Sequence, residues 1–232
     1  MYLDQLPELS RARLVRARSR GVAIRDRDRA VAVAFLADGS LLPADTMVRF
    51  DVTRGEEPAR RLTDALASTG ARSLWFYGGD AVTRRAALAL DLQLRPVGAA
   101  FVRRMDAARA VRVVFRPPSQ RDRVTLEEQQ REHAPAFAAP LAEVAEIDRD
   151  AVGLVFSEPL DAVWSELRVV VNPAFRGQGY AGALFAAAAD RLEATGRRVC
   201  AATESAAGRD RSALESAGFR LVDYYFSAAP KR

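Results

Sequence analysis

The sequence contains few residues that bind metals or form disulfides. Its 232 residues include one cysteine and one histidine. The lone Cys200 excludes an internal disulfide and a metal site built from several thiolates. His133 lies in the polar stretch EEQQREHAP, which is typical of an exposed helix end, and a zinc site or a Ser-His-Asp triad would depend on it alone. We therefore expect a protein that binds no metal.

Long apolar runs are also absent from the sequence. Arg or Asp interrupts every apolar stretch before it reaches the roughly 18 residues that a membrane span requires. The first twenty residues, MYLDQLPELSRARLVRARSR, lack the apolar segment of a secretory signal. These two absences predict a cytoplasmic protein that makes no contact with membranes.

Lysine is nearly absent too, since Lys231 is the only one and the formal net charge of +5 comes from arginine. The densest basic run, RARLVRARSR at residues 11–20, is a candidate for contact with a nucleic-acid backbone. However, acidic residues follow at once in RDRDR, and no aromatic residue or DNA-binding motif accompanies the run. We interpret it as the solvated face of a helix and expect no nucleic-acid partner.

The C-terminal half shows a regular alternation of strand and helix patterns. Residues 111–119 alternate and end in Pro-Pro, which predicts a strand, and a polar helix with a loop follows. A hairpin is predicted over residues 141–160, with its turn at Asp148-Arg149-Asp150. The remaining predicted elements are a strand at 165–171, a helix from Gly177 to Thr195-Gly196, a strand at 197–204, a helix at 208–218 and a strand at 219–228.

The N-terminal half repeats the second part of this order. The predicted elements are a strand at 47–53, a helix at 56–70, a strand at 71–79, a helix at 83–91 and a strand at 97–104. DALASTGARSLWFYG aligns with DRLEATGRRVCAATE, which places Thr69-Gly70 on Thr195-Gly196. The sequence therefore predicts a mixed α/β fold with two related halves, residues 1–108 and 109–232, joined near Asp106–Ala110.

The stretch GQGYAG at residues 177–182 matches the glycine fingerprint G-x-G-x-x-G of dinucleotide-binding folds. Such a fold needs its first glycine directly after the strand, so that the chain turns under the pyrophosphate. Here five residues separate Val171 from Gly177. Glu204 stands where a ribose-binding acid would lie, but only 28 residues follow it, too few for the remaining strands. This context argues against a nicotinamide or flavin dinucleotide.

Residues 171–181, VNPAFRGQGYA, resemble the acetyl-CoA loop of the GCN5-related N-acetyltransferases (GNAT), whose core is R-x-x-G-x-G/A. Arg176, Gly179 and Ala181 match that core, and AGFR at 217–220 resembles the closing signature of the family. The resemblance covers about residues 111–232, in the same order of strands and helices. It implies the GNAT acyl-CoA N-acyltransferase fold, with acetyl-CoA as the acyl donor.

The resemblance also implies which residues bind acetyl-CoA. A helix that opens at Gly177–Ala181 presents free N–H groups and its positive dipole end to a phosphate. Glycines there let the backbone approach the phosphate oxygens closely. In the family, the strand before the loop pairs with the amides of the pantetheine arm. The implied cofactor-binding residues are Val169, Val170, Val171, Arg176, Gly177, Gln178, Gly179, Tyr180, Ala181 and Gly182.

The catalytic residues of the family are matched less well. The Tyr that often protonates the departing thiolate, four residues before the G-F glycine, is Leu214 here, and an upstream Asn is Ala207. Glu166 begins the strand where the family often has a carboxylate base, although it stands one residue short of the usual spacing. Tyr225 on the last strand offers a phenol for the thiolate, so we assign catalytic roles to Glu166 and Tyr225.

Other polar side chains near the predicted site have simpler interpretations. Tyr224 is a second phenol on the last strand, for which strand packing is the simpler role. Glu143 and Glu146 on the hairpin are alternative bases, although charged hairpin residues are usually solvated. Cys200 lies in a strand that we expect to be buried, where packing is the expected role.

The N-terminal half carries Arg54-Gly55-Glu56-Glu57 in place of the glycine loop. Two carboxylates at a helix start would repel a pyrophosphate, so we expect this half to have lost the cofactor and to shape the acceptor cleft. The sequence therefore predicts one active site in a monomeric N-acetyltransferase that transfers acetyl, by direct attack, to a primary amine of a small molecule or peptide. A non-catalytic acyl-CoA-binding sensor or interaction module stays open as an alternative, and an arginine-rich nucleic-acid binder is the third hypothesis.

Overall fold

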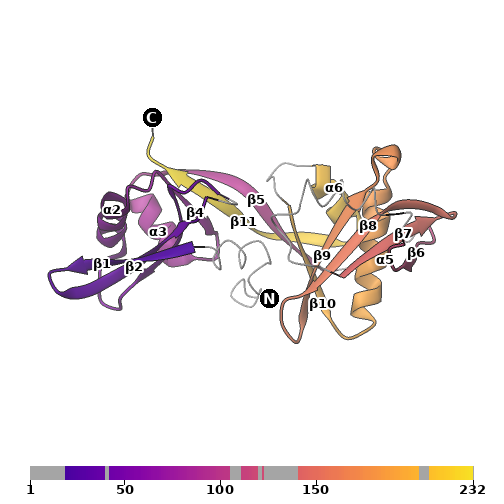
Figure 1. Cartoon of the computed structure of the whole chain (residues 1–232), viewed down its shortest axis with the longest axis horizontal. Helices are drawn as coiled ribbons and strands as arrows, with labels where there is room; N and C mark the ends of the chain where they lie inside the picture. Colours follow the sequence, from indigo (N-terminus) through magenta and orange to yellow (C-terminus); the bar gives the residue numbers. More distant parts are fainter. Residues whose placement is uncertain are drawn as a thin grey trace. The chain divides into compact units, whose positions relative to one another are not determined.

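The computed structural model of the chain describes residues 19–39, 42–104, 111–119, 122, 141–203 and 209–231. Figure 1 shows the elements in chain order. They are β1 (Ser19–Asp26), β2 (Arg29–Ala37), β3 (Thr46–Val52), α2 (Pro58–Thr69), β4 (Ser73–Tyr77), α3 (Ala81–Ala89), β5 (Gln93–Arg103), β6 (Val114–Arg116), β7 (Leu141–Ile147), β8 (Asp150–Pro159), β9 (Trp164–Val171), the 3-10 turn η4 (Pro173–Phe175), α5 (Tyr180–Glu193), β10 (Arg198–Thr203), α6 (Arg209–Ser216) and β11 (Phe219–Ala229).

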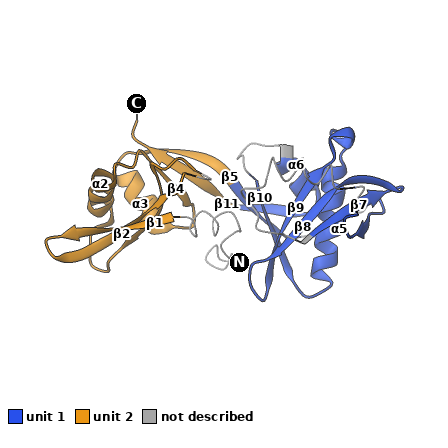
Figure 2. Ribbon diagram, viewed as in Figure 1, with its two compact units in different colours: residues 1–10, 99–222 blue, residues 11–98, 223–232 orange. Residues whose placement is uncertain are grey.

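The chain divides into two compact units (Figure 2). The described residues of unit 1 fall within 99–222, and those of unit 2 within 11–98 and 223–232. Two strands contribute to both units, because β5 enters unit 1 at Ala99 and β11 enters unit 2 at Asp223. The predicted boundary between residues 108 and 109 lies outside the described residues, and the division into two related halves stays a prediction.

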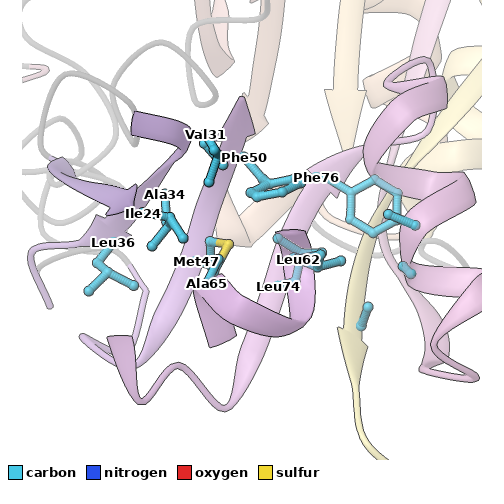
Figure 3. Packing of buried hydrophobic residues seen from close by; sticks show 14 residues of the cluster. Ile24, Val31, Ala34, Leu36, Met47, Phe50, Leu62, Ala65, Leu74 and Phe76 are labelled. Atoms are coloured by element: carbon cyan, nitrogen blue, oxygen red, sulfur yellow. The ribbon is translucent and has the colours of Figure 1, made fainter. Parts of the chain in front are cut away.

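Unit 2 is a mixed sheet covered on one face by two helices. Its strand order is β1-β2-β3-β4-β11, in which β3 and β4 run parallel and the other neighbours antiparallel. In Figure 3, Met47 of β3, Leu62 and Ala65 of α2 and Leu74 of β4 point toward one another. The buried cluster consists of Ile24, Val31, Ala32, Ala34, Leu36, Met47, Phe50, Leu62, Ala65, Leu74, Phe76, Ala86, Ala87 and Ala228.

Unit 1 has the same parallel pair at its centre. Its strand order is β5-β10-β9-β8-β7-β6, in which β9 and β10 run parallel and the other neighbours antiparallel. Helix α5 packs on β8, β9 and β10. The ring of Phe185 on α5 meets the ring of Phe219 edge-on, with 5.9 Å between their centroids. The mixed α/β architecture predicted from the sequence is confirmed.

Arg103, the last residue of β5, holds unit 1 together from inside. Its side chain is 1 % exposed, and its Nη2 lies 2.7 Å from Oδ1 of Asp190 on α5. Its Nη1 donates to the carbonyl of Ala217, which follows α6, and the guanidinium lies 5.8 Å from the centroid of the Phe219 ring. A buried guanidinium with these partners joins β5 to both helices of the unit.

Most predicted elements are confirmed by the structure within a few residues, and three points differ. Asp148 and Arg149 form the predicted hairpin turn, with φ of 52° and 75°. The strand predicted at 111–119 is limited to Val114–Arg116, because Pro117 cannot extend the ladder. Strands β1 and β2 were not predicted, and the interpretation as a helix face is wrong for Ser19 and Arg20, which begin β1.

Candidate acyl-CoA site

The parallel strands β9 and β10 separate part of the way along their length. They pair only at Trp164 with Arg198, Ser165 with Val199 and Glu166 with Cys200. Beyond Glu166, β9 continues to Val171 while it pairs with β8 on its other side. β10 continues to Thr203 while it pairs with β5. The second half of β9 therefore has a main-chain edge that β10 does not cover.

The direction of the main-chain groups along β9 follows from two hydrogen bonds. The N–H of Asn172 donates to the carbonyl of Val152 on the β8 side, and the carbonyl of Val163 accepts from Arg198 on the β10 side. Because main-chain groups alternate along a strand, Val169 and Val171 direct theirs away from β8, and Val170 directs its groups toward β8. Of the three valines predicted to bind a pantetheine arm, two therefore face the uncovered edge.

The segment after β9 folds into a compact loop. The side chain of Asn172 donates to the carbonyl of Ala151 and accepts from the N–H of Ala174, which begins the turn η4. Nε of Arg176 donates to the carbonyl of Val171 at 3.2 Å, so this side chain folds back over the end of the strand. Gly177 and Gly179 both have φ of +81°, a conformation that favours glycine.

Helix α5 begins without a side-chain cap. Gly179 is its N-cap residue and makes no capping hydrogen bond. The N–H groups of the first helical residues, Tyr180, Ala181 and Gly182, have no partner within a helix by its geometry. A Cβ added at Gly177 or Gly179 would meet no described atom within 4 Å, so the space in front of the helix is open. Free donors, a helix dipole and open space together fit a phosphate group.

Two further glycines set the position of α5. A Cβ at Gly182 would collide with Oγ of Ser216 on α6. A Cβ at Gly153 on β8 would lie 2.6 Å from the carbonyl oxygen of Val170 and 2.9 Å from Cδ1 of Leu184. Since Leu184 belongs to α5, the face of the sheet that contains Gly153 is the one covered by this helix. Gly182 therefore lets α5 lie close to α6, and its role in binding a cofactor stays a prediction.

Glu166 lies at the point where β9 and β10 separate. Its side chain is 1 % exposed, and it is the last residue of β9 that pairs with β10. It alternates with the residues that face α5, so its carboxylate lies on the opposite face of the sheet. Nη2 of Arg168 lies 3.5 Å from Oε1 of Glu166. The buried carboxylate of Glu166 therefore lies where the edge that β10 does not cover begins. A base that served this edge would need such a position.

Tyr225 lies in the other unit. Its ring stacks on that of Trp75, with 5.0 Å between centroids, and tilts against that of Tyr77 at 5.3 Å. It is 7 % exposed and pairs with Tyr77 across the ladder of β4 and β11. The structure therefore groups Glu166 and the loop in unit 1 and places Tyr225 in unit 2.

The other polar residues singled out from the sequence have structural partners or lie outside the described residues. Glu143 pairs with Arg191 at 2.8 Å, and Glu146 pairs with Arg116 at 2.6 Å. Sγ of the buried Cys200 donates to the carbonyl of Ser165 at 3.5 Å. Leu214 is fully buried and supplies no proton donor. His133, Glu204 and Ala207 lie outside the described residues.

Sequence reasoning did not single out Arg168. This residue is the one charge in the stretch LRVVV of β9, and a charge inside an apolar strand was the signal that could have identified it. Within the described ranges, no group of three or more His, Cys, Asp or Glu residues could hold a metal ion. No helix in this part of the chain is long and apolar enough to cross a membrane.

Comparisons with known proteins agree with this geometry. A family model described as the acetyltransferase (GNAT) family matches residues 105–219. The sequence matches none of the curated proteins.

Several solved structures are similar to the chain. An acetyltransferase of the GNAT family from Colwellia psychrerythraea aligns with 98 % of this chain and 91 % of its own, with a TM-score of 0.73 and 10 % identity. A GCN5-related N-acetyltransferase from Kribbella flavida aligns over 96 % and 94 %, with a TM-score of 0.57 and 14 % identity. A tandem GNAT protein from the clavulanic acid biosynthesis pathway aligns over 90 % and 82 %, with a TM-score of 0.56 and 16 % identity. At these identities the likeness shows a common fold.

Proposed function

Since residues 105–219 belong to the acetyltransferase (GNAT) family, which implies acyl transfer from acyl-CoA, we propose that the chain is an acetyl-CoA-dependent N-acetyltransferase. The proposed acceptor is a primary amine of a small molecule or a peptide, and the proposed reaction is direct attack on the thioester. The observation that carries the proposal is the open start of α5 at Gly179, directly after the strand β9 whose edge is uncovered.

The residues of unit 1 fit the shape and charge of a coenzyme A thioester. The free N–H groups at the start of α5 would hold the diphosphate, and the main-chain groups of Val169 and Val171 would hold the amides of the pantetheine arm. Acetyl-CoA, when bound, supplies the acetyl group as a thioester. All the proposed binding residues come from one continuous stretch, residues 169–182, so their relative positions depend on local geometry.

Acetyl transfer requires two proton transfers, each of which needs a suitably placed side chain. The reaction forms a nitrogen–carbon bond and breaks the carbon–sulfur bond, so the amine loses one proton and the thiolate has to be neutralised. Glu166 is the proposed base, which takes the proton of the amine directly or through a water molecule. Tyr225 is the proposed donor to the thiolate, and this assignment is supported only by its phenol, since its described partners are the rings of Trp75 and Tyr77.

The N-terminal half is proposed to be a degenerate copy without its own cofactor. Glu57 caps α2 and accepts hydrogen bonds from the N–H groups of Ala59 and Arg60, at 3.2 and 2.6 Å. A carboxylate therefore takes the place that a phosphate would need. The similarity to a tandem GNAT structure supports the arrangement of two halves. A monomeric state and a cytoplasmic location are proposed with it.

A second function has one observation in its favour. Leu214 is fully buried at the position where the family often carries the tyrosine that protonates the thiolate. A chain without that donor could bind acyl-CoA without turnover, as a sensor or interaction module.

Calorimetric titration with acetyl-CoA, and with NAD as the negative control, tests the binding site. We expect affinity for acetyl-CoA in the micromolar range and none for NAD. Release of coenzyme A thiol is then followed with a panel of small amines, amino sugars and peptide N-termini. The Glu166→Gln variant should lose about a hundredfold in kcat while it retains its affinity for acetyl-CoA. Binding without turnover on the whole panel would favour the second function, and absence of binding would rule out both.

A further inference from the structure

Arg168 is a charged residue in the part of β9 that β10 does not cover. Its side chain is 18 % exposed, and its neighbours in the strand are Leu167 and Val169. A guanidinium is costly to remove from water unless it meets an opposite charge or a polar ligand. The position of Arg168 therefore calls for a function.

The charged groups around Arg168 are few. Glu166 lies two residues earlier on the same face of β9, with Oε1 3.5 Å from Nη2 of Arg168. Glu158 of β8 is directly opposite Glu166 in the ladder, and Phe156 is opposite Arg168. This face of the sheet is the one that α5 does not cover, since Leu184 lies over Gly153 on the other face. Arg168 therefore lies on this face with Glu166, whose carboxylate forms an ion pair with it.

The direction of β9 indicates which end of a bound thioester would lie near Arg168. The phosphate-binding loop follows the C-terminal end of β9. An extended arm that runs from this loop along the uncovered edge passes Val171 and then Val169. Its thioester end therefore runs toward Arg168 and Glu166.

The leaving thiolate needs a group in unit 1 that offsets its negative charge, in addition to a donor that supplies its proton. Leu214, at the position where the family often has that donor, has no proton to give. A guanidinium stays protonated at any pH that the protein tolerates, so it can offset a negative charge without transferring a proton. Fixed cations near a developing anion stabilise a transition state in this way.

We propose that Arg168 is a catalytic residue that stabilises the thiolate of coenzyme A while the carbon–sulfur bond breaks. This inference rests on the proposed acyl-CoA site of unit 1. The electron pair of the broken bond goes to sulfur, the amine nitrogen takes the acetyl carbon, and Glu166 takes the amine proton. The thiolate remains paired with Arg168 until it takes a proton, from the phenol of Tyr225 or from water, as coenzyme A leaves.

The pKa of the thiol of bound coenzyme A measures this role without turnover. Thiolate absorbs in the ultraviolet, so its fraction can be followed against pH for coenzyme A free, bound to the wild type and bound to the Arg168→Gln variant. A cation within reach of the sulfur favours the thiolate, so we expect the wild type to lower the thiol pKa by about one unit or more. The Arg168→Gln variant should return it toward the free value, and kcat should fall more than the affinity for acetyl-CoA.

Three further variants separate this role from a structural one. Arg168→Lys retains the positive charge and should keep part of the shift. Glu166→Gln removes a negative charge from the same face and should lower the thiol pKa further. Arg198→Gln removes an arginine at the other end of the same strand pair, where its guanidinium lies 4.3 Å from the Trp164 ring, and should change nothing.

Failure of the role proposed for Arg168 can be distinguished from failure of the proposed function. Coenzyme A that binds with an unshifted thiol pKa in the wild type would overturn the role of Arg168 and leave the acyl-CoA site intact. Absence of coenzyme A binding would overturn the site itself, and the inference with it. If Arg168→Gln does not fold, the Arg168→Gln/Glu166→Gln double variant removes both charges and is compared with Glu166→Gln alone.

Discussion

Helix α5 of unit 1 begins at an open glycine, whereas helix α2 of unit 2 begins at a glutamate that caps it. Both helices follow a glycine with positive φ, Gly177 at +81° and Gly55 at +91°. The difference lies two residues later, where Gly179 leaves the helix donors free and Glu57 occupies them. The same kind of helix start therefore has no side-chain cap in one unit and is capped by the side chain of Glu57 in the other.

The strands before these helices separate in both units. β3 and β4 pair only at Thr46 with Ser73 and at Met47 with Leu74, and β9 and β10 pair at three positions. Unit 2 therefore has separated strands like those of unit 1, with its helix start capped by Glu57. This agreement in architecture supports the proposal that the N-terminal half is a degenerate copy.

The two units also differ in the element that carries their buried arginine. Arg61 lies on α2 itself and pairs with Asp26, Glu56 and Asp64 at 2.8–2.9 Å. The hydrogen bond from Arg61 lowers the pKa of Asp26. In unit 1 the guanidinium that holds α5 comes from Arg103 of β5, and its partner carboxylate is Asp190. Unit 1 is thus held by an arginine at the end of a strand, whereas the buried arginine of unit 2 lies on the helix itself.

The largest effect is expected from Arg103→Met. This substitution removes the guanidinium from its buried ion pair with Asp190, and breaking a buried pair costs about 3–5 kcal/mol. Each unit contains one tryptophan, Trp164 in unit 1 and Trp75 in unit 2, so urea unfolding of a Trp75→Phe background reports on unit 1. The neighbouring exposed Arg104→Met is the control and should change stability by less than about 0.5 kcal/mol. Equal effects of the two variants would contradict the role of Arg103.

Gly179→Glu makes the start of α5 resemble that of α2. The new carboxylate would occupy the free N–H groups and repel the diphosphate, so the affinity for acetyl-CoA should fall about a hundredfold, or about 2.8 kcal/mol. Gly196→Glu is the matched control, because Gly196 also has φ of +81° and open space around it but lies beyond the other end of α5. Calorimetric titration of both variants with acetyl-CoA measures the two affinities. Equal losses of affinity would show that backbone strain, and not charge at the loop, is responsible.

Glu57→Ala tests the cap of α2. It removes two hydrogen bonds to the helix start, and loss of an N-cap side chain costs about 1 kcal/mol. Fluorescence of Trp75 in a Trp164→Phe background would measure the loss in unit 2. Glu57→Asp keeps a carboxylate and should recover most of the stability. If Glu57→Ala had the same free energy of unfolding as the wild type, the cap would contribute nothing to stability.

The smallest effect is expected at Asp223, where β11 enters unit 2. Burial raises the pKa of its carboxyl group above the ordinary value. A folded-state pKa above the unfolded one means that ionised Asp223 opposes folding at neutral pH and that the penalty disappears as the pH falls through the raised value. Asp223→Asn should therefore stabilise unit 2 slightly at pH 7, by less than about 0.5 kcal/mol, and not at pH 3. If Asp223→Asn were less stable than the wild type at pH 7, this prediction would be wrong.

Local patterns predicted the elements around the candidate site well. The helix at 56–70, the hairpin at 141–160 and the helix after Gly177 appear as α2, β7–β8 and α5, because Pro, Gly and apolar spacing mark their ends. Strands β1 and β2 were missed. The stretch RAVAVAFLA of β2 is rich in alanine, which has little strand preference, so pairing with β1 and β3 determines its conformation.

The sequence alone determined the glycine loop before α5, since positive φ at Gly177 and Gly179 and an uncapped helix start are local properties of the backbone. Only the tertiary structure decided which strand completes each sheet. β5 pairs with β10 and β11 pairs with β4, so strands of the predicted N-terminal half pair with strands of the predicted C-terminal half. Main-chain hydrogen bonds are the same for every residue, so strand partners are chosen by packing that no local pattern encodes. For the same reason, the position of Glu158 on β8 opposite Glu166 on β9 became visible only when the strands were placed side by side.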